Sequence, residues 1–99
     1  MEFLGEDFEY LCKSFLTLHT EEECKNYLLD LCSMAEIVEF GRRLHVARLL
    51  HEKKNYNEIA EETSTSSATI SRVNRCLRYG NDGYRHVLEE MDREQGKRE

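Results

Sequence analysis

The sequence contains no proline in 99 residues, and only five glycines. Proline and glycine are the residues that most often interrupt helices, because one lacks a backbone donor and the other loses much conformational entropy on folding. The sequence therefore predicts an all-α chain. Its length fits one domain, over residues 1–94, followed by a frayed tail at residues 95–99. A domain of this size leaves much apolar surface uncovered, so we expect it to associate with another subunit.

Apolar residues recur at helical spacing and predict six helices, at about residues 6–18, 21–32, 34–52, 56–62, 67–79 and 84–94. Two residue pairs have the spacing of capping boxes. Thr20 with Glu23 lies at the start of the second predicted helix, and Ser33 with Glu36 lies at the start of the third. Lys53 and Lys54 suit the carboxyl end of the third helix, where the backbone dipole is negative. The third helix is apolar around most of its circumference, which predicts burial on two sides and contact with a second subunit.

The outer helices are expected to bury one apolar face each. The first presents Phe8, Leu11, Cys12 and Phe15, the second presents Cys24, Tyr27, Leu28, Leu31 and Cys32, and the last presents Tyr84, Val87, Leu88 and Met91. Between the last two helices, residues 80–83 read Gly-Asn-Asp-Gly, and a turn is expected there because glycine and asparagine tolerate positive φ.

Catalytic and metal-binding residues are not expected in this chain. Its four cysteines lack metal-ligand spacing and are interpreted as small apolar fillers, and its four histidines are scattered. We predict neither enzyme activity nor a cofactor. The sequence has no apolar run long enough to span a membrane, and residues 1–7 are acidic rather than basic, so a cytoplasmic protein is expected.

Charge is distributed unevenly along the chain. The formal net charge is −6, but residues 1–41 contain two basic against ten acidic residues, whereas residues 42–86 contain nine basic against five acidic. Exposed charges act over roughly a Debye length, about 8–10 Å at physiological salt. A basic face can therefore bind DNA on a protein that is acidic overall, provided that the acidic half points away.

Residues 56–79 have the pattern of a helix-turn-helix, which is two short helices joined by a tight polar turn. Ile59 and the small Ala60 on the first helix face Ile70 and Val73 on the second. The glycine typical of the turn is replaced by Ser64, which would cost about 1–2 kcal/mol in a left-handed conformation.

The second helix of this hairpin contains no acidic residue between residues 66 and 79. Small residues at its start would let it enter the major groove, and its arginines can reach phosphates or guanine edges. The predicted DNA-binding residues are Lys53, Lys54, Asn57, Ser66, Ser67, Ala68, Thr69, Ser71, Arg72, Arg75 and Arg78. A merely solvated polar face is the alternative interpretation.

The sequence resembles the Trp repressor superfamily, and within it the YerC/YecD group of Trp repressor-related proteins. The similarity runs from about Glu21 to Met91. It rests on Leu31-Cys32-Ser33, Gly41-Arg42-Arg43, Ile59-Ala60, Ser67-Ala68-Thr69-Ile70-Ser71-Arg72 and Leu88-Glu89-Glu90. The resemblance implies an intertwined homodimer with six helices per chain, whose recognition helix enters the major groove of double-stranded DNA and represses transcription.

The resemblance also implies a site for a small-molecule effector. In the Trp repressor, tryptophan lies between two arginines that correspond to Arg43 and Arg72, near a hydroxyl residue at the position of Ser33. The glycine after the second arginine is replaced here by Val73, and a later serine by Cys76. Overpacking costs about 1–3 kcal/mol, so tryptophan is not the expected effector. Alternatively, the two arginines pair with Glu36, Glu39 or backbone carbonyls.

These observations lead to two functional hypotheses. The first is a homodimeric, sequence-specific DNA-binding transcriptional repressor, whose helix at 67–79 reads a palindrome with half-sites about one DNA turn apart. The alternative is a protein-interaction adaptor that docks an acidic partner on the same hairpin without binding DNA. The negative net charge and Ser64 keep this alternative open.

Overall fold

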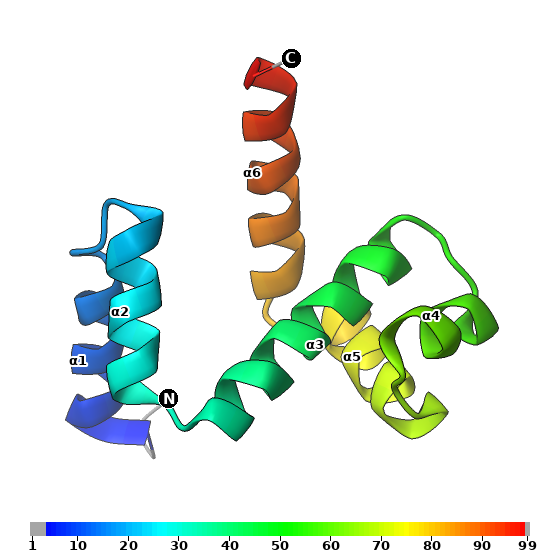
Figure 1. The fold of residues 1–99 in the computed structure, drawn as a ribbon, viewed down its shortest axis with the longest axis horizontal. Coiled ribbons are helices and arrows are strands. Elements are labelled where there is room, and N and C mark those ends of the chain that lie inside the picture. Colours follow the sequence, from blue (N-terminus) through cyan, green and yellow to red (C-terminus); the bar gives the residue numbers. More distant parts are fainter. Residues whose placement is uncertain (1–3, 99) are drawn as a thin grey trace. The chain divides into compact units, whose positions relative to one another are not determined.

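The protein is described by a computed structural model that covers residues 4–98 (Figure 1). Its helices are α1 (Gly5–Phe15), α2 (Glu21–Leu31), α3 (Met34–His51), α4 (Tyr56–Thr63), α5 (Ser67–Tyr79) and α6 (Gly83–Arg98). No strand occurs in the part that the structure describes, which confirms the predicted fold class. The chain divides into two compact units, Met1–Ile37 and Val38–Glu99. Among the described residues, no helix is long and apolar enough to cross a membrane.

The first unit is a hairpin of α1 and α2, which lie side by side in Figure 1. Thr20 begins α2 with the predicted capping box: its hydroxyl accepts from the N–H of Glu23, whose carboxylate accepts from the N–H of Thr20. The hairpin is joined by a hydrogen bond of 2.5 Å between the hydroxyls of Ser14 and Tyr27. The rings of Phe15 and Tyr27 also meet edge to face, with centroids 5.4 Å apart.

The expected burial of the first two helices is not found within one chain. Neither α1 nor α2 contains a buried residue. Cys12 is exposed and Cys24 and Cys32 are half-buried, so the prediction that these cysteines fill a core is wrong for the isolated chain. Phe8 and Leu31 also remain exposed. Two helices cannot enclose each other's apolar faces, so this surface has no cover within its own unit.

The second unit has a hydrophobic core to which four helices contribute. Val46, Ala47 and Leu49 come from α3, Ile59 from α4, Ile70 and Val73 from α5, and Leu88 from α6. Only the carboxyl half of α3 is buried in this core, since Val38 and Phe40 stay exposed. On α6, Val87 and Met91 are likewise exposed and Tyr84 is half-buried, so the prediction that all four apolar residues of this helix are buried is wrong.

Three residues with left-handed backbone lie next to helix ends in this unit. Lys53 follows α3 with φ 69°, and Ser64 follows α4 with φ 54° and ψ 41°. Asp82 has φ 64° before α6. The turn over residues 80–83 was expected from its glycines and asparagine, but its left-handed residue is the aspartate. Gly80 is required for a different reason, because a Cβ there would clash with the carbonyl oxygen of Cys76.

Two helix ends differ from the prediction. Helix α1 ends at Phe15, and the next residues form tighter turns in which Leu16 and Leu18 donate to carbonyls three residues earlier. Helix α6 continues to Arg98 instead of ending near Glu94. An ion pair between Glu90 and Arg93, one turn apart, lies within the part of this helix that was predicted.

Candidate nucleic-acid interface

Helices α4 and α5 form a hairpin with a tightly bonded turn. Ile59 and Ile70 are fully buried at their contact, and Val73 is nearly so. The hydroxyl of Thr63 donates to the carbonyl of Ile59 at 2.7 Å, and that of Thr65 donates to the carbonyl of Thr63 at 3.2 Å. Ser64 takes the left-handed conformation that glycine usually supplies here, although it is not a glycine. The turn therefore holds α5 at a fixed angle to α4.

The amino-terminal end of α5 is small, polar and open. Ser66 is its N-cap and accepts a hydrogen bond from the N–H of Thr69 at 3.2 Å. Ser67 and Ala68 are exposed, so no large side chain covers the first turn. The uncapped N–H groups and the positive dipole end favour an anion at this position.

Three arginines extend from the exposed side of α5. Arg72, Arg75 and Arg78 are all exposed, and none belongs to an ion pair among the described residues. Two arginines of α3 differ in this respect, since Arg42 and Arg43 both lie within 4 Å of the Glu39 carboxylate. The positive charge of α5 is therefore not neutralised by neighbouring carboxylates within its unit.

The other predicted DNA-binding residues lie around this helix. Lys53, Lys54 and Asn57 are exposed in the loop before α4 and in its first turn. Thr69 and Ser71 are half-buried on α5, and the hydroxyl of Thr69 lies 3.1 Å from that of Ser66. Thr69 thus contributes to the start of the helix more than to its most exposed face.

The structure brings Arg43 and Arg72 to one pocket of about 300 Å³. Its lining residues are Glu39, Arg43, Thr69, Arg72, Val73, Cys76 and Tyr84. Arg43 lies 3.8 Å from Glu39 through Nε, and its guanidinium also stacks over the Phe40 ring at 5.3 Å. The pairing of Arg43 with Glu39 that the sequence offered as an alternative is therefore present, whereas Arg72 has no such carboxylate.

Ser33, the third predicted effector residue, belongs to the first unit. Its hydroxyl accepts from the N–H of Glu36 at 3.2 Å, and its own N–H donates to the Glu36 carboxylate at 2.8 Å. The backbone N–H of Ser33 thereby lowers the pKa of the Glu36 carboxyl, since it stabilises the charged form. The structure thus gives Ser33 a capping role at the start of α3.

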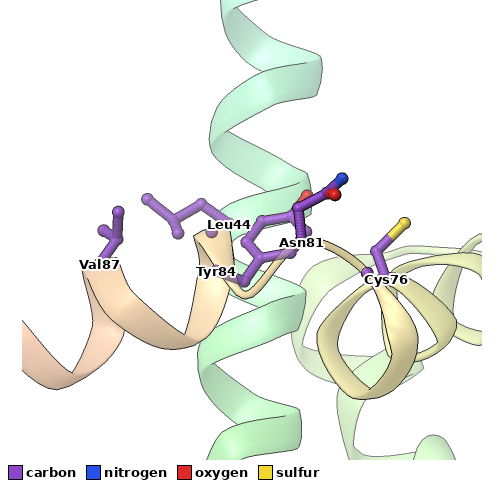
Figure 2. A pocket seen from close by; sticks show the side chains of 7 residues that line it. Leu44, Cys76, Asn81, Tyr84 and Val87 are labelled. Atoms are coloured by element: carbon purple, nitrogen blue, oxygen red, sulfur yellow. The ribbon is translucent and has the colours of Figure 1, made fainter. Parts of the chain in front are cut away.

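A second, apolar pocket of about 530 Å³ lies beside the first, where α3, α5 and α6 meet. Figure 2 shows Leu44, Cys76 and Val87 around the ring of Tyr84, with Asn81 beside it. Cys76 and Tyr84 line both pockets. The described residues contain no group of three or more potential ligands that could hold a metal ion.

Sequence reasoning missed two polar residues of the hairpin. Asn74 on α5 donates through Nδ2 to the hydroxyl of Tyr56 on α4 at 3.2 Å, and accepts at Oδ1 from Nε of Arg78 at 3.0 Å. The spacing of Asn74 and Arg78, four residues apart on a helix, was a usable signal. Nothing local links Tyr56 to Asn74, because that contact depends on how the two helices cross.

This arrangement defines a helix-turn-helix protein of the all-α class, with a basic, acid-free second helix. The Trp repressor protein family profile matches residues 6–92, so the chain belongs to the Trp repressor family. It is 46% identical over 87 residues to the uncharacterised protein YerC of Bacillus subtilis strain 168, covering 88% of this chain and 84% of YerC.

Two solved structures share the fold. A candidate Trp repressor from Staphylococcus aureus has a TM-score of 0.85 at 38% identity, covering 93% of this chain and 95% of that one. A TrpR-like protein from Eubacterium eligens ATCC 27750 has a TM-score of 0.86 at 41% identity, covering 93% and 96%. These likenesses confirm the resemblance noted in the sequence.

Proposed function

We propose that this protein is a sequence-specific DNA-binding transcriptional repressor whose helix α5 enters the major groove. The observation that carries this proposal is the set of three exposed arginines on a helix without acidic residues, none of them paired with a carboxylate among residues 4–98. Membership of the Trp repressor family supports the same function.

Each part of the hairpin has a role in this proposal. The first turn of α5, with Ser67 and Ala68, approaches the base edges because its side chains are small. Arg72 and Arg75 supply charge-assisted hydrogen bonds to phosphates or to guanine O6 and N7. Lys53 and Lys54 neutralise the flanking backbone, so affinity falls as salt rises.

The proposal includes a homodimer. In it, a second copy of the chain covers the first unit and also the open apolar pocket of the second unit. The helices α1 and α2 bury no residue in one chain, and Leu44, Tyr84 and Val87 line a pocket open to solvent. Large exposed apolar surfaces are unfavourable in water and are typical of subunit interfaces. A two-fold dimer would present two copies of α5 about 34 Å apart, which matches a palindromic target.

Fluorescence anisotropy with labelled genomic fragments over a salt series tests DNA binding. We expect affinity to fall steeply with salt, and Arg72→Glu together with Arg75→Glu to weaken binding at least about 100-fold while the fold is retained. The matched control is Lys13→Glu with Lys25→Glu, which makes the same charge change on the first unit. Salt-independent binding, or equal losses in both double variants, would contradict the proposal.

An adaptor that docks an acidic protein on the same hairpin is the alternative function, which the net charge of −6 and the serine in the turn leave open. Affinity capture before and after nuclease treatment separates the two functions. The adaptor predicts a stoichiometric protein partner that survives nuclease and is lost in the Arg72 and Arg75 variant. The repressor predicts that nucleic acid is the retained material.

We further propose that the pocket containing Arg43 and Arg72 does not take tryptophan. Val73 is only 2% exposed and forms part of the pocket wall, and the Glu39 carboxylate lies beside Arg43. The branched side chain opposes an indole ring, and the carboxylate opposes an amino acid's own carboxylate near Arg43. Saturating tryptophan should therefore leave the DNA dissociation constant unchanged. A fivefold or greater increase in affinity would contradict this assignment.

A further inference from the structure

A chain of hydrogen-bonded side chains crosses from α4 to α5 on one flank of the hairpin. Tyr56 is the first residue of α4, Asn74 lies in the middle of α5, and Arg78 follows one turn later. The side-chain amide of Asn74 makes two hydrogen bonds. Its Nδ2 donates to the Tyr56 hydroxyl at 3.2 Å, and its Oδ1 accepts from the Arg78 Nε at 3.0 Å. Asn74 is half-buried, whereas the other two side chains are exposed.

The chemistry of the partners fixes the orientation of the amide. A guanidinium can only donate hydrogen bonds, so Oδ1 of Asn74 must face Arg78, and Nδ2 is left for the Tyr56 oxygen. In this orientation the Tyr56 hydroxyl accepts from Asn74 and keeps its own hydrogen for another acceptor. Arg78 uses Nε on Asn74 and keeps the two Nη groups, which carry four N–H donors.

The remaining donors suit phosphate oxygens. Phosphate oxygens accept hydrogen bonds from arginine and from tyrosine hydroxyls, and such contacts fix the register of a protein on DNA. Arg78 loses rotamer freedom when Nε is held, and a long side chain ordered in advance makes later contacts at a lower entropic cost. The tether also draws Arg78 to the α4 flank of α5.

We propose that Asn74 is a positioning residue for DNA binding, which holds Tyr56 and Arg78 together as one phosphate-contacting pair at the seam between α4 and α5. This inference rests on the proposed function. In this proposal Arg78 contacts the phosphate backbone of the DNA and not the base edges. Tyr56 is added to the DNA-binding surface.

A double-mutant cycle tests the inference with the full chain and a genomic fragment that the wild-type protein binds. Asn74→Ala should weaken binding about three- to tenfold, the usual effect of losing a hydrogen bond. In an Arg78→Ala background the same substitution should change affinity less than twofold, because its partner is gone. Asn26→Ala, at an exposed polar site of α2, is the matched control and should have no effect.

A measurement on the free protein separates the tether from DNA binding. In nitrogen-15 NMR spectra, the Nε–H proton of Arg78 should exchange slowly with solvent in the wild type and faster in Asn74→Ala and in Tyr56→Phe. Equal exchange in all three proteins, or additive effects in the cycle, would overturn the inference while leaving the proposed function intact. Absence of wild-type binding to DNA would overturn the proposed function, and the role in DNA binding with it.

Discussion

Ser64 carries the left-handed backbone of the turn between α4 and α5, with φ 54°. A side chain in this conformation is strained, whereas glycine adopts it readily. Ser64→Gly should therefore raise the free energy of unfolding by about 1 kcal/mol, as measured by urea denaturation. Ser64→Ala retains the Cβ and should give no gain. Equal stabilisation by both substitutions would contradict the strain argument.

Glu36 makes the start of α3 sensitive to pH. The backbone N–H of Ser33 lowers the pKa of the Glu36 carboxyl in the folded chain, so its stabilising contribution is present above the ordinary glutamate pKa of about 4.3. This contribution is lost as the pH falls through the lowered folded value. Glu36→Gln keeps the capping geometry without the charge. Its free energy of unfolding, measured by urea denaturation, should therefore be lower than that of the wild type at neutral pH, and the difference should shrink in acid. The same deficit at pH 7 and pH 3 would contradict this.

At the scale of the elements, α5 begins at the N-cap Ser66. Ser66 accepts from the N–H of Thr69, so Ser66→Ala should lower the free energy of unfolding by about 1 kcal/mol. Ser67→Ala, one position further on, is the matched control and should be nearly neutral. Urea denaturation of both variants measures the difference, and equal losses would show that the cap contributes nothing specific.

The helices were predictable because their signals are local. The capping boxes of Thr20 and Ser33 and the spacing of Ile70 and Val73 are each contained within a few residues of sequence. Ser64 is an exception, because a serine gives no local signal for a left-handed backbone. The same reasoning located the exposed arginines of α5. It could not locate the hydrogen bond from Asn74 to Tyr56, which depends on how two helices cross.

At the scale of the whole molecule, the burial predicted for α1 and α2 is absent from their own unit, because a hairpin of two helices cannot enclose its apolar faces. Sequence periodicity shows that a face is apolar, but not whether the residues covering it belong to the same chain. Phe8 and Leu31 on these helices are exposed in the single subunit. The proposed homodimer supplies the missing cover.

Leu31→Glu tests this assignment of the apolar surface. Burying a leucine contributes about 1.5–3 kcal/mol, so a carboxylate at this position should raise the dimer dissociation constant at least about tenfold. Asn26→Glu makes the same charge change at an exposed polar site of α2 and should leave the dimer intact. Sedimentation equilibrium measures both. A monomeric wild-type protein at micromolar concentration would contradict the dimer.

In vitro selection of bound DNA by the purified wild-type protein is the most direct test of paired recognition helices. The account predicts enrichment of a two-fold symmetric site whose half-site centres are about 10 base pairs apart. The enrichment should disappear when Arg72 and Arg75 are both replaced by glutamate. Enrichment of an unsymmetrical site, or of no sequence at all, would contradict it.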